Sequence, residues 1–188
     1  MNPSVLNDKK VIGSEGFILG EVEGVEVDLE TWQASMLYVR LSDEAAAGLG
    51  LRTPSFMSKT TICLPIRFVK FVGDVITLSE PVRNLEDVAE KECIVNPTNL
   101  KGKKVVGAKG QNVGEVESLD LEPSTWQVTG LQVSLTNEAA KELECNKSFL
   151  RKVVVSVPTK IVDTVGNMII LNEDIQDFKT LAKRLQYG

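Results

Sequence analysis

Apolar and polar residues alternate along two neighbouring stretches near the start of the chain, residues 17–29 and 33–41. The apolar positions of the first stretch are Val22, Val25, Val27 and Leu29. In the second stretch, one set of alternate positions is Leu37, Val39 and Leu41, and the other is Met36, Tyr38 and Arg40. A period of two is typical of a β-strand with one buried face. The pattern predicts a long hairpin, with a bulge or bend near Gly24, where strict alternation fails.

The same pattern returns 94 residues later, over residues 105–143. The shift aligns Gly13, Gly16 and Gly20 with Gly107, Gly110 and Gly114, and it aligns Thr31-Trp32-Gln33 with Thr125-Trp126-Gln127. An internal repeat of this length indicates two domains of similar architecture. The turn-forming residues 96–99 break the chain between the copies. We therefore expect one domain at residues 1–95 and a second at residues 96–188.

Each half also contains further strand-like runs and two helix-like runs. In the first half the strand-like runs are residues 9–13, 61–65, 66–72 and 74–78. Ser42 and Thr136 are suited to cap short helices at residues 43–49 and 137–143. Apolar stripes at residues 82–89 and 175–182 predict a C-terminal amphipathic helix in each half. The fold class expected is mainly β, with two tandem small six-stranded barrels, because closure removes exposed strand edges.

Charge and histidine content exclude several classes of function. The net charge of -5 and the pI near 5.0 argue against nucleic acid as the main partner, since phosphate binding needs a basic face. The chain has no histidine, the commonest general base and metal ligand. We expect no catalytic residues, no metal and no cofactor, and therefore no enzymatic activity.

The cysteines and the apolar runs bear on the compartment. Cys63, Cys93 and Cys145 form no C-x-x-C pair, and their odd number favours a reducing cytoplasm. Cys63 lies in an apolar run and is interpreted as a small buried hydrophobe. No apolar run approaches the length of a membrane span. These features predict a soluble cytoplasmic protein without direct membrane insertion.

The glycine-punctuated opening and the closing segments of both halves resemble the PRC-barrel family. The residues that carry the resemblance are Gly13, Gly16 and Gly20, residues 157–162, and the closing segments 72–78 and 165–171. The family includes the C-terminal domain of the ribosome maturation factor RimM and the cytoplasmic part of the photosynthetic reaction centre H subunit. The resemblance covers nearly the whole chain, and it implies two tandem barrels of PRC type.

PRC-barrels are generally adaptors, so the resemblance implies a non-enzymatic protein–protein interaction role. A tandem, acidic form looks most like the archaeal cell-division PRC-barrel proteins (the CdpB group). Their relatives bind SepF, the membrane anchor of the FtsZ ring, and pair with PRC-barrel paralogues. Homo- or hetero-oligomers and recruitment to the division site through the membrane-anchored partner are expected on this basis. One alternative is a RimM-like ribosome-assembly or RNA-associated factor. Another is a small-molecule-binding or enzymatic barrel, and the absence of histidine argues against it.

Differences between the two copies indicate where a partner binds. The first copy has Met36, Tyr38, Phe71 and Phe17 where the second has Gly130, Gln132, Thr164 and Gln111. Exposed apolar residues grouped on one domain are typical of an interface, which favours the first copy as the protein-binding one. The alternation places Tyr38 on the outer surface; core packing against the terminal helices is the other interpretation.

Aromatic residues shared by both copies form a second set of candidates. They are Trp32 and Trp126 in the hairpins, and Phe56 and Phe149 in the loop motif Ser-Phe-x-x-Lys. Each is either a structural aromatic or a contact anchor, since tryptophan is enriched at binding hot spots. The carboxylate pairs Glu21/Glu23 and Glu115/Glu117 alternate with valines, which predicts a solvated strand face rather than acid–base chemistry.

Overall fold

The computed structural model describes residues 6, 8–51, 60–85, 100–145, 152–175 and 177. The chain divides into two compact units, which we describe separately. The first unit comprises mainly Pro3–Thr98 with Pro123–Gln127, and the second comprises mainly Asn99–Glu122 and Val128–Gly188. The boundary expected at residues 95/96 falls outside the described residues and stays a prediction.

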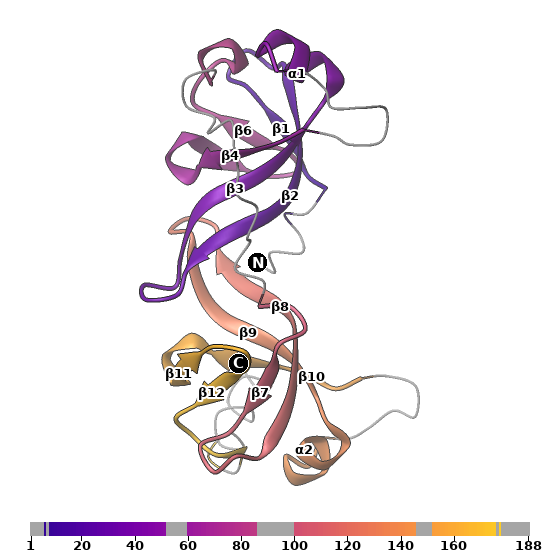
Figure 1. The fold of residues 1–188 in the computed structure, drawn as a ribbon, viewed down its shortest axis with the longest axis vertical. Helices are drawn as coiled ribbons and strands as arrows, with labels where there is room; N and C mark the ends of the chain where they lie inside the picture. Colours follow the sequence, from indigo (N-terminus) through magenta and orange to yellow (C-terminus); the bar gives the residue numbers. More distant parts are fainter. Residues whose placement is uncertain are drawn as a thin grey trace. The chain divides into compact units, whose positions relative to one another are not determined.

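The first unit is a curled sheet of short strands around one long hairpin (Figure 1). Its elements are β1 (Lys10–Ile12), β2 (Ile18–Asp28), β3 (Gln33–Leu41), α1 (Asp43–Gly48), β4 (Thr61–Pro65), η2 (Ile66–Phe68), β5 (Val69–Val72), β6 (Ile76–Leu78) and η3 (Val82–Leu85). The strands are ordered β5-β6-β1-β2-β3-β4. Only the β1–β6 pairing among these described strands is parallel; the others are antiparallel.

The second unit repeats this arrangement element by element. Its elements are β7 (Lys104–Val106), β8 (Asn112–Glu122), β9 (Gln127–Leu135), α2 (Asn137–Glu142), β10 (Val154–Pro158), η4 (Thr159–Ile161), β11 (Val162–Val165) and β12 (Ile169–Leu171). The strands are ordered β11-β12-β7-β8-β9-β10, with β7 and β12 parallel. The prediction of a mainly β fold is confirmed.

Each sheet curls without a closing ladder in the part of the chain that the structure describes. In the first unit β4 and β5 are the end strands, and η2 joins them directly. No backbone ladder pairs β4 with β5, or β10 with β11, among these residues. The described strands therefore form a curled half-barrel, and the closed six-stranded barrels expected from the sequence stay a prediction.

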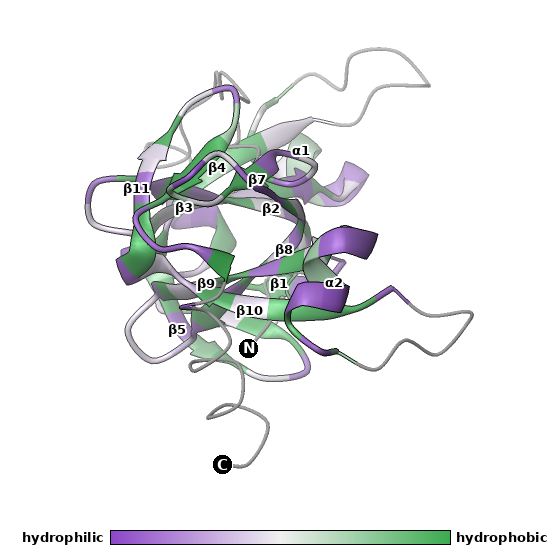
Figure 2. Ribbon diagram, turned by 90° about the horizontal axis from the view of Figure 1, so that it is seen from below, coloured by the Kyte–Doolittle hydropathy of each residue, from purple (hydrophilic) through white to green (hydrophobic). Residues whose placement is uncertain are grey.

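The inward face of each curled sheet carries the core. Alternate positions of β3, Leu37, Val39 and Leu41, are buried, and so are Leu131, Val133 and Leu135 of β9. Val11, Ile76 and Leu78 complete the same face in the first unit. The short helices present their buried alanines to the sheet and hydrophilic residues outward (Figure 2). The packing of the strands follows the alternation in the sequence.

Glycine is required at position 20 because the β3 backbone approaches β2 closely there. A Cβ built at this position would lie 2.0 Å from the Arg40 carbonyl oxygen, and one at Gly114 would lie 2.1 Å from the Ser134 carbonyl oxygen. Only a residue without a side chain fits this approach. The bulge predicted near Gly24 is confirmed, since the register of β2 on β3 shifts between Val22 and Gly24.

The helix caps predicted from the sequence are confirmed. The Ser42 hydroxyl accepts a hydrogen bond from the Ala45 N–H at 3.1 Å, and Thr136 accepts one from Ala139 at the same distance. The C-terminal amphipathic helices lie largely outside the described residues: η3 covers only residues 82–85 of the first.

One predicted strand is interrupted. The run 66–72 begins with a 3-10 turn, η2, and becomes a strand only at Val69. Pro65 has φ -56° and ψ 134°, so it ends β4 in an extended conformation and lets the chain turn the corner into β5. Pro158 does the same in the second unit. Periodicity alone gave no sign of this corner.

Candidate protein-binding surface

A row of directly paired residues crosses four strands on the outer face of the first unit. Ile18 of β2 pairs with Ile12 of β1, Ile12 pairs with Thr77 of β6, and Thr77 pairs with Phe71 of β5. Residues directly opposite each other on neighbouring strands share a face of the sheet. We call these four residues the outer row of the first unit.

The ends of this outer row are solvent-exposed. Phe71 is 65% exposed and Ile18 is 44% exposed, whereas Leu19, which follows Ile18 on β2, and Ile76, which precedes Thr77 on β6, are fully buried. Phe17, immediately before β2, is 39% exposed. An aromatic ring that leaves two thirds of its surface in water contributes little to folding and is available for association. The exposure expected for Phe17 and Phe71 is confirmed.

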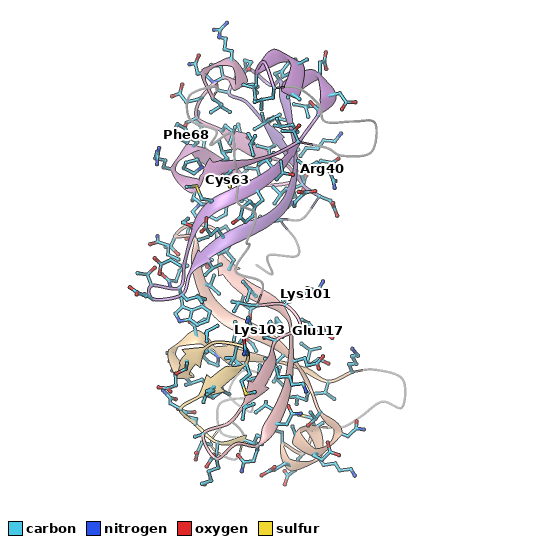
Figure 3. The ribbon with its side chains drawn as sticks, viewed as in Figure 1. Arg40, Cys63, Phe68, Lys101, Lys103 and Glu117 are labelled. Atoms are coloured by element: carbon cyan, nitrogen blue, oxygen red, sulfur yellow. The ribbon has the colours of Figure 1, made fainter. Side chains whose placement is uncertain are left out.

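The Phe71 ring is held by the turn that follows its strand. A Cβ at Gly73 would lie 2.8 Å from the Phe71 Cε1 atom, so the ring folds back over the turn. The Lys9 ammonium donates a hydrogen bond to the Gly73 carbonyl at 2.6 Å. In the second unit the Lys103 ammonium, labelled in Figure 3, donates the equivalent hydrogen bond to the Gly166 carbonyl at 2.5 Å, but there is no aromatic ring at the position of Phe71. Both units therefore contain this hydrogen bond from a lysine to a glycine carbonyl, whereas only the first unit has an aromatic side chain beside it.

The second unit carries polar residues at the ends of its equivalent row. Asn112 pairs with Val106, Val106 pairs with Ile170, and Ile170 pairs with Thr164. We call these four residues the outer row of the second unit. Its exposed apolar residue is central: Ile170 is 38% exposed. The two rows therefore have the same geometry and different chemistry.

The outward position expected for Tyr38 is wrong. Its side chain is only 2% exposed, although it lies on the face of β3 opposite Leu37 and Val39. Tyr38 is directly paired with Gly24, which has no side chain, and a Cβ there would lie 3.6 Å from the ring. The ring lies over the β2 backbone instead of projecting into solvent. Burial accordingly raises the pKa of Tyr38, with a smaller contribution from Glu26.

Polar residues occupy the equivalent place in the second unit. The Asp120 carboxylate accepts hydrogen bonds from the Gln132 amide and the Ser156 hydroxyl, each at 2.6 Å. The corresponding residues of the first unit are Glu26, Tyr38 and Cys63. Cys63 is buried, as expected. This difference between the copies is one of packing and does not mark a docking face.

The remaining candidates are distributed over different environments. Met36 is half-buried on β3. Trp32 and Trp126 both adopt positive φ, 55° and 59°, at the ends of their hairpin loops, and Trp32 is half-exposed whereas Trp126 is buried. In the first loop the Asp28 carboxylate accepts hydrogen bonds from the Thr31 and Glu30 N–H groups. Phe56 and Phe149 lie outside the described residues, so their roles stay predictions.

The carboxylates of β2 are held by an arginine on the neighbouring strand. Arg40, labelled in Figure 3, bonds Glu21 at 2.9 Å and Glu23 at 3.2 Å, and Glu23 also accepts from Thr61 at 2.8 Å. The hydrogen bond to Glu21 is the main cause of the raised pKa of Arg40. The sequence predicted only a solvated strand face for Glu21 and Glu23 and did not predict their ion pairs with Arg40. Arg40, the one basic residue among the alternating positions of β3, was the sequence signal that could have indicated these ion pairs.

A shallow hollow of about 120 Å³ lies beside Arg40, bordered by Lys10 and Ile18. Acidic groups already neutralise the guanidinium, so the hollow offers no net positive charge to an anion.

In the described part of the chain, no group of three or more histidine, cysteine, aspartate or glutamate side chains could hold a metal ion. Among the described helices, none is both long enough and apolar enough to span a bilayer.

Comparison with known proteins identifies the second half of the chain. Residues 95–176 match the PRC-barrel domain. Among solved structures, the chain is similar to a protein from Pseudomonas aeruginosa described as a 16S ribosomal RNA processing protein, RimM. The identity is 12%, the TM-score is 0.26, and the match covers 83% of this chain and 94% of that one, a likeness too low to carry an argument. No curated protein matches the chain. The family match therefore establishes a PRC-barrel domain at residues 95–176 of this chain.

Proposed function

We propose that the protein is a non-enzymatic adaptor that binds another protein through the outer row of its first unit. The observation that carries this proposal is the contrast between two rows of the same geometry. Phe71 and Ile18 are exposed where the second unit has Thr164 and Asn112. If the fold required an apolar residue at the position of Phe71 or Ile18, the second unit would be expected to carry an apolar residue at the equivalent position. A solvent-exposed ring present in one copy alone suits binding.

The architecture proposed with this function is a pair of tandem PRC-type barrels. The repeat and the shared strand order support extending the PRC-barrel assignment to the first unit. The partners proposed are those that the resemblance to the archaeal cell-division proteins implies, SepF and a PRC-barrel paralogue. In that setting the adaptor is cytoplasmic and reaches the division site through its membrane-anchored partner.

The test compares two threonine substitutions that each copy the other unit. Phe71→Thr gives the first unit the residue of the second, and Val154→Thr gives the second unit the residue that β4 carries at Thr61. Val154 is 40% exposed but lies outside both outer rows. Partners captured from cells of the source organism by the wild type are purified, and their binding to the three proteins is titrated.

Phe71→Thr should weaken binding by about 5- to 150-fold, because burial of an aromatic ring contributes about 1–3 kcal/mol. Val154→Thr should leave binding unchanged. Equal affinity of all three proteins would contradict the proposed surface. Salt-sensitive co-sedimentation with ribosomal subunits, with no captured protein partner, would support the RimM-like alternative instead.

A further inference from the structure

We infer that the outer row of the first unit binds the outer row of the second unit in another copy of the chain. The inference rests on the proposed function, because it uses the same face and names what occupies it. Two features of the rows support a second copy as the occupant. They are complementary side-chain sizes at equivalent positions and an opposite charge beside each row.

The sizes of the side chains are complementary position by position. In a contact about a local twofold axis that runs along the rows, each position of one row faces the equivalent position of the other. Phe71 then faces Thr164, and Ile18 faces Asn112. At the centre the order reverses, because the small residue Thr77 belongs to the first unit and the large residue Ile170 to the second. At these three positions a larger residue of one row faces a smaller residue of the other.

The charges beside the rows are also complementary. Lys70 precedes Phe71 on β5, and Asp163 precedes Thr164 on β11; both are exposed. Within the described part of the chain, neither side chain forms an ion pair. Two first units brought together would oppose lysine to lysine, and two second units would oppose aspartate to aspartate. Only the pairing of unlike units opposes lysine to aspartate, and this selects the heterologous contact.

Such a contact is head-to-tail. It uses one outer row from each copy and leaves the other two rows available, so it either closes into a dimer or ring or extends into a chain. The rows span about 14 Å across four strands at the usual strand spacing. Each row is small, so we expect a concentration-dependent assembly rather than an obligate one.

The decisive experiment uses two variants that each disable one row. Phe71→Thr and Ile170→Thr both introduce the residue that the other unit has at the equivalent position. Both sites are exposed, so folding should be nearly unaffected, which circular dichroism melting checks. Each purified variant alone, and their equimolar mixture, are then compared with the wild type by sedimentation velocity across a wide concentration range.

The wild type should associate, and each variant alone should be about tenfold or more weaker in self-association. The mixture should form a one-to-one heterodimer. Ile170→Thr retains an intact first-unit row and Phe71→Thr retains an intact second-unit row. Because this dimer has no further matched rows, it should not grow with concentration. Val154→Thr should behave like the wild type.

Charge exchange provides an independent measurement. Lys70→Asp and Asp163→Lys should each weaken self-association severalfold, and the double variant should restore it, because the opposed charges are again unlike. Self-association of Ile170→Thr at wild-type strength would overturn the inference and indicate a contact between first units. A wild type that stays monomeric throughout would overturn it as well. The proposed function would survive either result if another protein still bound through Phe71.

Discussion

Tyr38 lies over Gly24, its direct partner on the neighbouring strand, with 3.6 Å between the ring and the position that a glycine Cβ would occupy. The ring is thereby buried on the face of β3 that points away from the main core. Glycine at this position leaves the β2 backbone open to an aromatic side chain. A residue of the outer face thus belongs to the fold and not to the docking surface.

Substitution of Tyr38 by glutamine should therefore destabilise the first unit. The loss of a buried aromatic ring should cost about 2–4 kcal/mol. Tyr38→Phe keeps the ring and should cost less than about 1.5 kcal/mol. Urea denaturation of the three proteins measures this. A change of less than about 0.5 kcal/mol for Tyr38→Gln would show that the ring is dispensable.

The hydrogen bonds of Asp120 should be worth more to the second unit than a typical surface contact. Ser156→Ala removes one donor to the carboxylate and should cost about 1–2 kcal/mol. Gly130→Met, which copies Met36, should cost more, because a Cβ there would lie 2.8 Å from the Ser156 hydroxyl. Thr129→Ser, on the next residue of β9, serves as a control. If Gly130→Met had the same melting temperature as the wild type, the hydrogen bonds of Asp120 would be shown to tolerate displacement of the Ser156 side chain.

Gly20 should tolerate no side chain. Gly20→Ala places a methyl group 2.0 Å from the Arg40 carbonyl oxygen and should cost about 3 kcal/mol or more, since backbone must move. Gly48→Ala meets nothing within 4 Å and lies in α1, where it should stabilise by about 0.5–1 kcal/mol. Denaturation midpoints of the two variants should move in opposite directions. Equal midpoints would contradict the close approach of β2 and β3.

Acid should weaken the second unit through Asp174. The hydrogen bond and ion pair with Lys109 hold the pKa of Asp174 below its ordinary value. Such a group adds stability above its unfolded pKa of about 4, and this stability is lost as the pH falls through the lower folded value. Asp174→Asn should be less stable than the wild type at neutral pH, and the difference should vanish once the pH falls below the lowered folded pKa of Asp174. A difference independent of pH would exclude this ionisation as its cause.

Much of the fold was predictable because local chemistry determines it. Alternation located β3 at its observed bounds, and Ser42 and Thr136 located the helix starts, since a capping hydroxyl needs only the next turn of chain. The corner at Pro65 was not predicted. It depends on how β4 must meet β5 across the unit, which no short window of sequence contains.

The candidate surface was predictable only in part. Comparing the two copies located Phe17 and Phe71 correctly as exposed differences, but it placed Tyr38 with them. Alternation assigns residues to two faces of a strand without saying what covers each face. The covering of Tyr38 depends on its pairing with Gly24 and so on register, which the bulge in β2 shifts. The outer row likewise depends on the parallel pairing of β1 with β6, which joins residues far apart in sequence.

The central claim is that the outer row of the first unit contacts protein in the cell, and site-specific photo-crosslinking tests it most directly. A benzophenone amino acid at position 71 replaces one exposed aromatic with another, and the same probe at Ala47, exposed on α1, serves as the control. Irradiation of source cells should produce a covalent protein adduct at position 71 and none at position 47. Mass spectrometry of the adduct then shows whether the partner is another copy or a different protein. No adduct at position 71, or equal labelling at both positions, would contradict the claim.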